Sequence, residues 1–243
     1  MKKGKKAQVT IFIIIAISLA LIFLVIYLNK DKITLINKDP EIGIAQELIN
    51  DCFELGSQNS PFLFGKQGGI VNPEKTIEIE GLNISVLYSK DEIELLTVSE
   101  MENELSELFN ENFLKCIDNF SYLESRGYIT ERGILESEIR LNDEVEFEIN
   151  FPVNIRKEES SYQLKNDYSK TIPIRFDRYY GLIDKIISQQ KTNPGDLDIV
   201  SLLDYGLNIN ATRAGDNLVF LLEDDKSETN NKTYKFLFGV EIN

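Results

Sequence analysis

The chain has 243 residues, with 26 Lys and Arg against 40 Asp and Glu, two Cys, and no His or Trp. The lack of His excludes Ser-His-Asp triads, Cys-His pairs and zinc sites that need His. A net charge of −14 argues against a nucleic-acid partner held by a general positive field. We find no glycine-rich phosphate-binding motif, and we predict no cofactor.

An apolar run near the N-terminus, residues 9–28, is the strongest signal in the sequence. Thr10 and Ser18 are its only polar interruptions. At 1.5 Å per residue a helix of this length spans about 30 Å, the thickness of the bilayer core. A cleaved secretory signal has a shorter apolar region followed by small residues, whereas Asn29-Lys30-Asp31-Lys32 follows here. We therefore predict a retained transmembrane helix, with the lipid bilayer as a partner.

The charges on either side of this run predict its orientation. Four Lys residues precede it, which favours a cytoplasmic N-terminus under the positive-inside rule. We predict a basic cytoplasmic tail at 1–8, a transmembrane helix at 9–28, a polar stalk at 29–39 and an extracytoplasmic body at 40–243. The first 32 residues carry six Lys and one Asp, so the remaining chain has a formal charge of −19.

The residues before the apolar run carry a family resemblance. Lys6-Ala7-Gln8-Val9-Thr10 resembles the processing site of archaeal type IV pilin-like proteins with a class III signal. The resemblance implies cleavage between Ala7 and Gln8, although Phe12 stands where that family has Glu. The Lys-rich anchor with two later Cys is also similar to uncharacterised archaeal single-pass membrane proteins.

Small residues in the predicted membrane helix indicate a possible contact between helices. Ala16 and Ala20 lie one turn apart, and small residues at this spacing let two helices approach closely. Two alanines among twenty apolar residues also arise by chance. Self-association and docking to other envelope proteins both remain open.

The body reads as an α+β fold, with antiparallel sheet and two or three packed helices. We expect a helix over 40–55 ended by Gly56 and Ser60-Pro61, a hairpin over 76–88, and a helix over 99–117 opened by a capping box of Ser99 and Glu102. Division into two lobes, about 40–125 and 126–243, is an option.

The second half of the body alternates apolar and polar residues, the pattern of half-buried strands. It does so over 145–153, where Pro152 indicates an edge or a bulge, and again over 172–176. We expect a helix after Asp177 as N-cap, a short helix at 199–203, and strands at 207–212, 218–222 and 234–242.

Two features of the body bear on chemistry. Cys52 and Cys116 each fall near the end of a predicted helix, and we expect them to pair in an oxidising space, with two free buried thiols as the alternative. Residues 223–228 hold many side-chain oxygens, as calcium sites do, but we interpret them as a polar hairpin loop.

The sequence thus predicts no catalytic, cofactor-binding or metal-ligating residue. We expect a non-enzymatic, membrane-anchored structural or interaction protein of the cell envelope. The alternatives are a pilin-like subunit, a membrane-tethered hydrolase that uses carboxylates, and an ion or ligand sensor.

Overall fold

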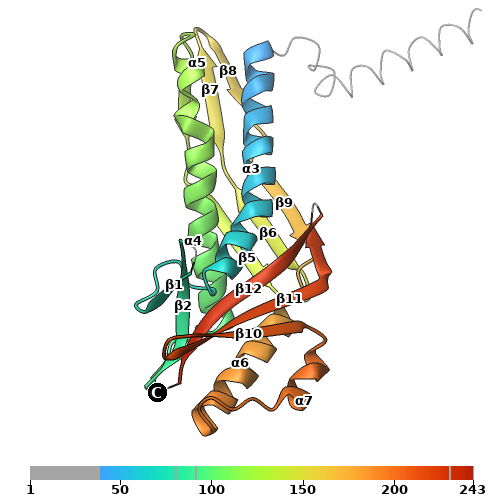
Figure 1. Ribbon diagram of the computed structural model, residues 1–243. Helices are drawn as coiled ribbons and strands as arrows, with labels where there is room; N and C mark the ends of the chain where they lie inside the picture. Colours follow the sequence, from blue (N-terminus) through green and yellow to red (C-terminus); the bar gives the residue numbers. More distant parts are fainter. Residues whose placement is uncertain (1–38, 80, 91, 230, 243) are drawn as a thin grey trace, which may run out of the picture. The chain divides into compact units, whose positions relative to one another are not determined.

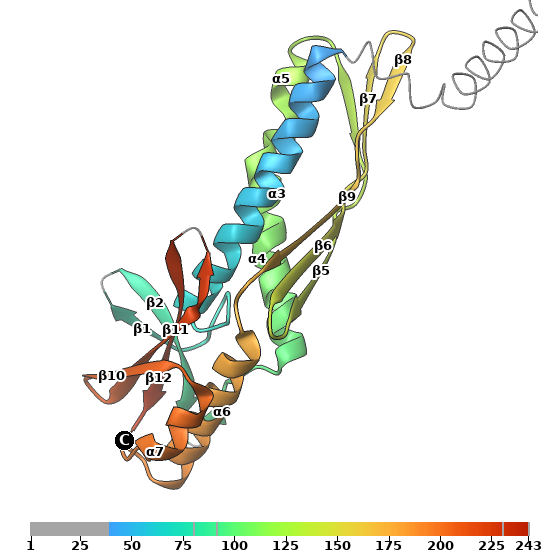
Figure 2. The same ribbon diagram turned by 90° about the vertical axis from the view of Figure 1, so that its right-hand side faces the viewer.

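The computed structural model describes residues 39–242 apart from 80, 91 and 230, and residues 44–243 form one compact unit. Among the described residues, no helix has both the length and the apolar character needed to cross a bilayer. The predicted membrane helix at 9–28 lies outside the described residues. The fold of the body is α+β with mostly antiparallel sheet, as predicted (Figures 1 and 2).

Two long helices, α3 (Pro40–Lys66) and α4 (Val98–Ile117), lie side by side in both views (Figures 1 and 2). The ring of Phe109 on α4 lies 6.1 Å from the ring of Phe53 on α3 and 5.4 Å from that of Phe147 in the adjacent sheet. Each of these phenylalanines belongs to the buried face of its helix or strand, where apolar residues repeat with the period of that element. Helix α4 is therefore packed between α3 and a sheet.

The prediction that Gly56 and Ser60-Pro61 end the first helix is wrong, because α3 continues to Lys66 with Pro61 inside it. A Cβ at Gly56 would lie 3.0 Å from the ring of Phe109, so this glycine permits close packing of α3 on α4. Phe64, beyond the proline, is only 1% exposed. Burial of this last turn compensates for the hydrogen bond that a helical proline removes.

Helix α4 begins one residue before the predicted start at 99, and its N-cap lies two residues before the predicted one. Its N-cap is Thr97, and the reciprocal capping pair is Thr97 with Glu100 instead of Ser99 with Glu102. Glu102 accepts a hydrogen bond from the backbone N–H of Leu141 at 2.9 Å. The short helices η2 (Asp118–Phe120) and α5 (Ser121–Glu124) follow α4.

A three-stranded antiparallel sheet packs against α4. It consists of β5 (Glu136–Leu141), β6 (Val145–Asn150) and β9 (Asp167–Ile172), in the order β5-β6-β9. Its buried residues alternate with polar ones on the outer face, as predicted. A second sheet has the order β4-β7-β8, from β4 (Ile129–Arg132), β7 (Val153–Lys157) and β8 (Ser160–Gln163).

The predicted strand over 145–153 is divided in the structure. Pro152 lies between β6 and β7, and its carbonyl accepts from the N–H of Gly133 at 2.8 Å. Because proline has no N–H to give to a sheet, the chain changes from one sheet to the other at this point. The strand expected over 172–176 is wrong, because only Ile172 lies in a strand, as the last residue of β9, and Phe176 begins the next helix.

The remaining strands form a sheet ordered β1-β2-β12-β11-β10, with β3 (Glu92–Ile93) paired to β2. The strands are β1 (Thr76–Ile79), β2 (Leu82–Ser89), β10 (Asn208–Ala214), β11 (Asn217–Thr229) and β12 (Lys232–Glu241). Only the β12–β2 pair is parallel among the described pairs of this sheet. The predicted hairpin and the three final strands are confirmed.

Helix α6 (Phe176–Thr192) lies below β10 and β11 in Figure 1 and packs on this sheet. The ring of Tyr179 meets that of Tyr234 on β12 at 5.0 Å. The predicted N-cap, Asp177, is wrong: α6 starts at Phe176 and Arg175 is its N-cap, without a side-chain capping bond. The short helices α7 (Ile199–Leu202) and η3 (Leu203–Tyr205) then lead into β10.

Candidate functional site

The two cysteines are joined. Cys52 on α3 and Cys116 on α4 form a disulfide with an S–S distance of 2.05 Å and Cα atoms 5.7 Å apart. Cys52 is 1% exposed, so the bond is sheltered from solvent on that side. The predicted pairing is confirmed, and the alternative of free buried thiols is wrong.

The other predicted site residues belong to the N-terminal region. Ala7 and Gln8 of the predicted processing site, and Ala16 and Ala20 of the predicted packing face, lie outside the described residues. Processing and helix packing therefore stay predictions.

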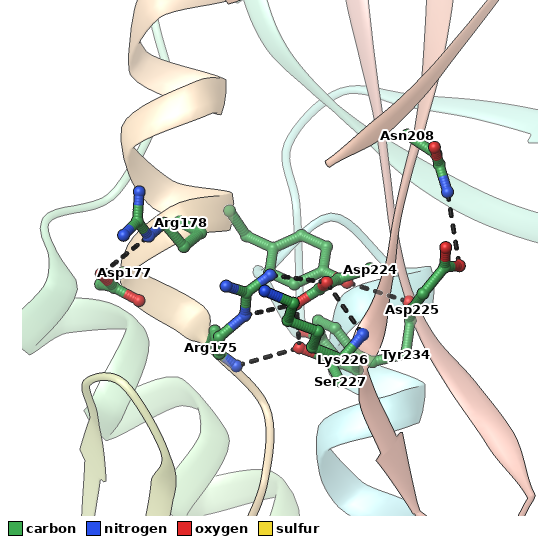
Figure 3. A network of polar contacts seen from close by, with 10 residues as sticks. Arg175, Asp177, Arg178, Asn208, Asp224, Asp225, Lys226, Ser227 and Tyr234 are labelled. Carbon is green, nitrogen blue, oxygen red and sulfur yellow. Dashed lines mark hydrogen bonds and ion pairs between the residues drawn. The ribbon is translucent and has the colours of Figure 1, made fainter. Parts of the chain in front are cut away.

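A cluster of polar side chains joins α6 to β11 (Figure 3). Arg175, at the start of α6, donates from Nε and Nη2 to the two carboxylate oxygens of Asp224 at 2.8 and 2.7 Å. The Ser227 hydroxyl donates to Asp224 Oδ2 at 2.6 Å and accepts from the Arg175 N–H at 3.1 Å. The side chain of Asp224 is 2% exposed and that of Arg175 is 26% exposed. The arrangement is a bidentate and largely desolvated ion pair.

A break in the β11–β12 ladder brings Asp224 into this position. Glu223 pairs with Lys235, and the next pair is Glu228 with Thr233, so β11 advances five residues while β12 advances two. Surplus residues of this kind leave the ladder and re-aim their side chains. The interpretation of residues 223–228 as a hairpin loop is wrong, because β11 continues to Thr229 and these residues form an irregular strand.

The donors around Asp224 determine what it can do chemically. Burial raises its pKa, but the hydrogen bonds from Arg175, Ser227 and the Lys226 N–H outweigh burial, and the net pKa is lowered. Four donors already occupy the two oxygens. Within the described part of the chain, no group of three or more His, Cys, Asp or Glu is placed to hold a metal. This cluster fastens α6 to the sheet.

A tyrosine pair lies beside this cluster. The Tyr179 hydroxyl donates to the backbone carbonyl of Tyr234 at 3.1 Å. Burial, the largest cause, raises the pKa of both phenols, so both are neutral near pH 7. They add neutral, buried packing to the contact between α6 and β12.

Acid should reduce the stabilisation that ionised Asp224 gives to the fold, and a variant without this carboxylate should not show that loss. Because the pKa of folded Asp224 lies below its unfolded value near 3.9, the stabilisation is complete above about pH 4 and is lost as pH falls through the folded pKa. We expect the gap in unfolding free energy between wild type and Asp224→Asn to narrow from pH 5 to pH 2.5. Urea titrations at both pH values measure it, and a constant gap contradicts the assignment.

A second polar feature is an open acidic groove of about 820 Å³ on the outer face of the β5-β6-β9 sheet. Its lining includes Glu136, Glu138, Glu148 and Asp167. Glu138 lies directly opposite Glu148 in the ladder, and Arg140 approaches them at 2.7 and 3.7 Å. Their side chains are 64% and 56% exposed, whereas catalytic carboxylic acids are generally buried against apolar groups. We interpret the groove as a solvated acidic face.

Sequence reasoning missed both Arg175 and the acidic groove. The alternation over 172–176 placed Arg175 between two apolar residues, but nothing local indicates its partner 49 positions later. The acidic face had a usable signal, since Glu146 and Glu148 alternate with buried Val145, Phe147 and Ile149.

Comparison with known proteins adds no assignment. No protein-family model matches the chain, and neither a curated protein nor a solved structure does.

Proposed function

We propose that the chain is a membrane-anchored protein of the cell envelope whose body, residues 40–243, faces the extracytoplasmic space and acts by binding other proteins, without enzymatic activity. The observation that carries this proposal is the Cys52–Cys116 disulfide. Structural disulfides persist in oxidising compartments and are rare in a reducing cytosol. A disulfide in the body thus agrees with export past the predicted membrane helix.

Charge supports the same orientation. The residues after position 32 carry a formal charge of −19, whereas the first 32 carry an excess of five positive charges. Basic residues favour the cytoplasmic side, and an acidic body is repelled by anionic lipid headgroups. An interaction role fits a surface whose acidic groove is open and solvated.

Cell fractionation with protease treatment of intact cells tests the location. We expect the full chain in the membrane fraction after alkaline washing, with the body digested by external protease and a cytoplasmic marker untouched. A variant with Ile14→Arg and Ile15→Arg is the control, since each charge costs about 3 kcal/mol at the centre of a membrane helix. It should leave the membrane. Full-length wild type in a detergent-free cytosolic supernatant, with free thiols, would contradict the proposal.

The pilin-like alternative is tested on the same preparation. Processing between Ala7 and Gln8 would give a mature protein that starts at Gln8. Mass spectrometry of the N-terminus decides between the two, because a start at Met1 or Lys2 excludes the processed subunit. Either result leaves the location of the body to the fractionation experiment.

A further inference from the structure

Strand β10 is an open edge of the β1-β2-β12-β11-β10 sheet (Figure 1). It pairs with β11 along its whole length, from Asn208↔Glu223 to Ala214↔Asn217. Within the described residues, no other strand pairs with it. Five of its seven residues are exposed. Its outer row of backbone groups is therefore available to another strand.

The hairpin fixes which backbone groups point outward. Ala214 and Asn217 close a two-residue turn whose first residue, Gly215, has φ +63, as a type II′ turn requires. The closing pair of such a hairpin is hydrogen-bonded, and hydrogen-bonded pairs then alternate along the ladder. The N–H and C=O groups of Ile209, Ala211 and Arg213 consequently point away from β11.

This edge lacks the protections that usually prevent strand addition. Its sequence, Asn-Ile-Asn-Ala-Thr-Arg-Ala, has no proline, its ladder with β11 has no register shift, and its only charge is Arg213. The guanidinium of Arg213 turns back to the carbonyl of Gly215 at 3.1 Å. The opposite edge strand, β1, has only four residues and carries Glu78.

Exposed aliphatic side chains precede this edge directly. Ile199, Val200 and Leu203 are 50%, 77% and 62% exposed, on the short helices that lead into β10. Strand pairing at an edge needs apolar contact in addition to backbone hydrogen bonds. The chain supplies both within residues 199–214.

We propose that β10 pairs antiparallel with β10 of a second copy of this chain, around a two-fold axis at Ala211. In this register Ala211 faces its own counterpart, and Ile209 faces Arg213 of the other copy. The three outward residues are then paired with one another, and each pair exchanges two N–H···O=C bonds. A two-fold axis at any other residue would place at least one of these three residues opposite a residue that is not one of them.

Symmetry favours a second copy as the occupant, and the charge of the strand itself does not oppose it. A two-fold contact uses the same surface on both partners, and twofold dimers are the commonest oligomers. The single charge of the strand faces isoleucine across the axis, so no like charges are opposed. This inference deepens the proposed function by naming a partner. It rests on the proposed function in one respect only, that anchoring in the same membrane gives both copies the same orientation.

Cysteine crosslinking of the full chain in detergent tests the register. In an antiparallel hydrogen-bonded pair the Cα atoms lie about 5.5 Å apart, within the range that a disulfide spans. We expect Ala211→Cys to give a crosslinked dimer under mild oxidation. Asn208→Cys is the matched control, because it is equally exposed but would lie about 20 Å from its counterpart at ~3.4 Å per residue.

Each outcome has a defined meaning. Crosslinking at 211 with none at 208 supports the proposal. Equal crosslinking at both positions indicates parallel pairing or random collision, and none at either indicates that β10 does not meet itself; both results overturn it. Because the experiment uses purified protein, its failure leaves the location of the body untouched, and failure of the fractionation experiment leaves the crosslink untouched.

Two charge variants at one position give a second test. Because both lose the same isoleucine, the comparison between them cancels the effect of that loss on folding. In the Ala211→Cys background, Ile209→Glu places an opposite charge across from Arg213, and Ile209→Lys places a like charge there. Both replace the same half-buried isoleucine. We expect several-fold more crosslinking for Glu than for Lys. General repulsion between acidic bodies would give the reverse order, which would overturn the register.

Discussion

Reduction of the Cys52–Cys116 disulfide is expected to lower the free energy of unfolding by about 4 kcal/mol. The bond joins residues 64 apart in the sequence and ties α3 to α4. In the chain-entropy account, a crosslink of this span mainly restricts the unfolded chain, so its loss gives that chain more freedom. Urea unfolding with and without reductant measures the difference, and the slope with urea should rise as the unfolded state expands.

A double variant, Cys52→Ala with Cys116→Ala, separates the crosslink from the packing of the sulfur atoms. It should unfold more easily than oxidised wild type, and somewhat more easily than reduced wild type because buried Cys52 leaves a small void. Reductant should have no further effect on it. Equal free energies of unfolding for oxidised and reduced wild type would mean that the bond does not stabilise the body.

Local periodicity predicted much of this fold because most elements bury one face. Phe147 and its alternate neighbours on β6 are buried as the two-residue period requires. Cys52 is buried and Cys116 is half-buried, and the prediction that they pair rested on an even count of cysteines in a body expected to be exported. The long helices, the first hairpin, β6 and the three final strands were predicted from their periods with shifted ends, whereas β4, β5 and β8 were not predicted individually.

The errors arise where tertiary contacts override local signals. Gly56 and Pro61 are helix breakers in isolation, but Gly56 allows Phe109 to approach α3 and burial of Phe64 holds the last turn. Residues 223–228 have the composition of a loop, yet β11 continues through them because Asp224 finds Arg175. Such partners lie far away in the sequence, and no local pattern encodes them.

The candidate interaction edge illustrates the same limit. The sequence predicts a strand over 207–212, but whether that strand is central or at an edge depends on sheet order. Exposure of Val200 and Leu203 likewise depends on how α7 and η3 pack. An open edge can therefore be recognised only once the topology is known.

Removal of Arg175 is expected to destabilise the body more than removal of its partner. Arg175→Met leaves the carboxylate of Asp224 buried without a counter-charge, at a cost of about 3–5 kcal/mol. Asp224→Asn leaves a guanidinium that is 26% exposed and can gain water, at a cost of about 1–3 kcal/mol. Urea unfolding of both variants, with Arg175→Met/Asp224→Asn completing a double-mutant cycle, measures the coupling.

The adjacent residue supplies a matched control for this asymmetry. Glu223 pairs with Lys235 at 2.6 Å, but their side chains are 31% and 47% exposed, so Glu223→Gln should cost less than about 1 kcal/mol. Two carboxylates one position apart on β11 thus differ in effect because one is desolvated and the other is hydrated. If Arg175→Met costs no more than Glu223→Gln, water reaches Asp224 in the folded protein. The break in the ladder would then not serve to bury an ion pair.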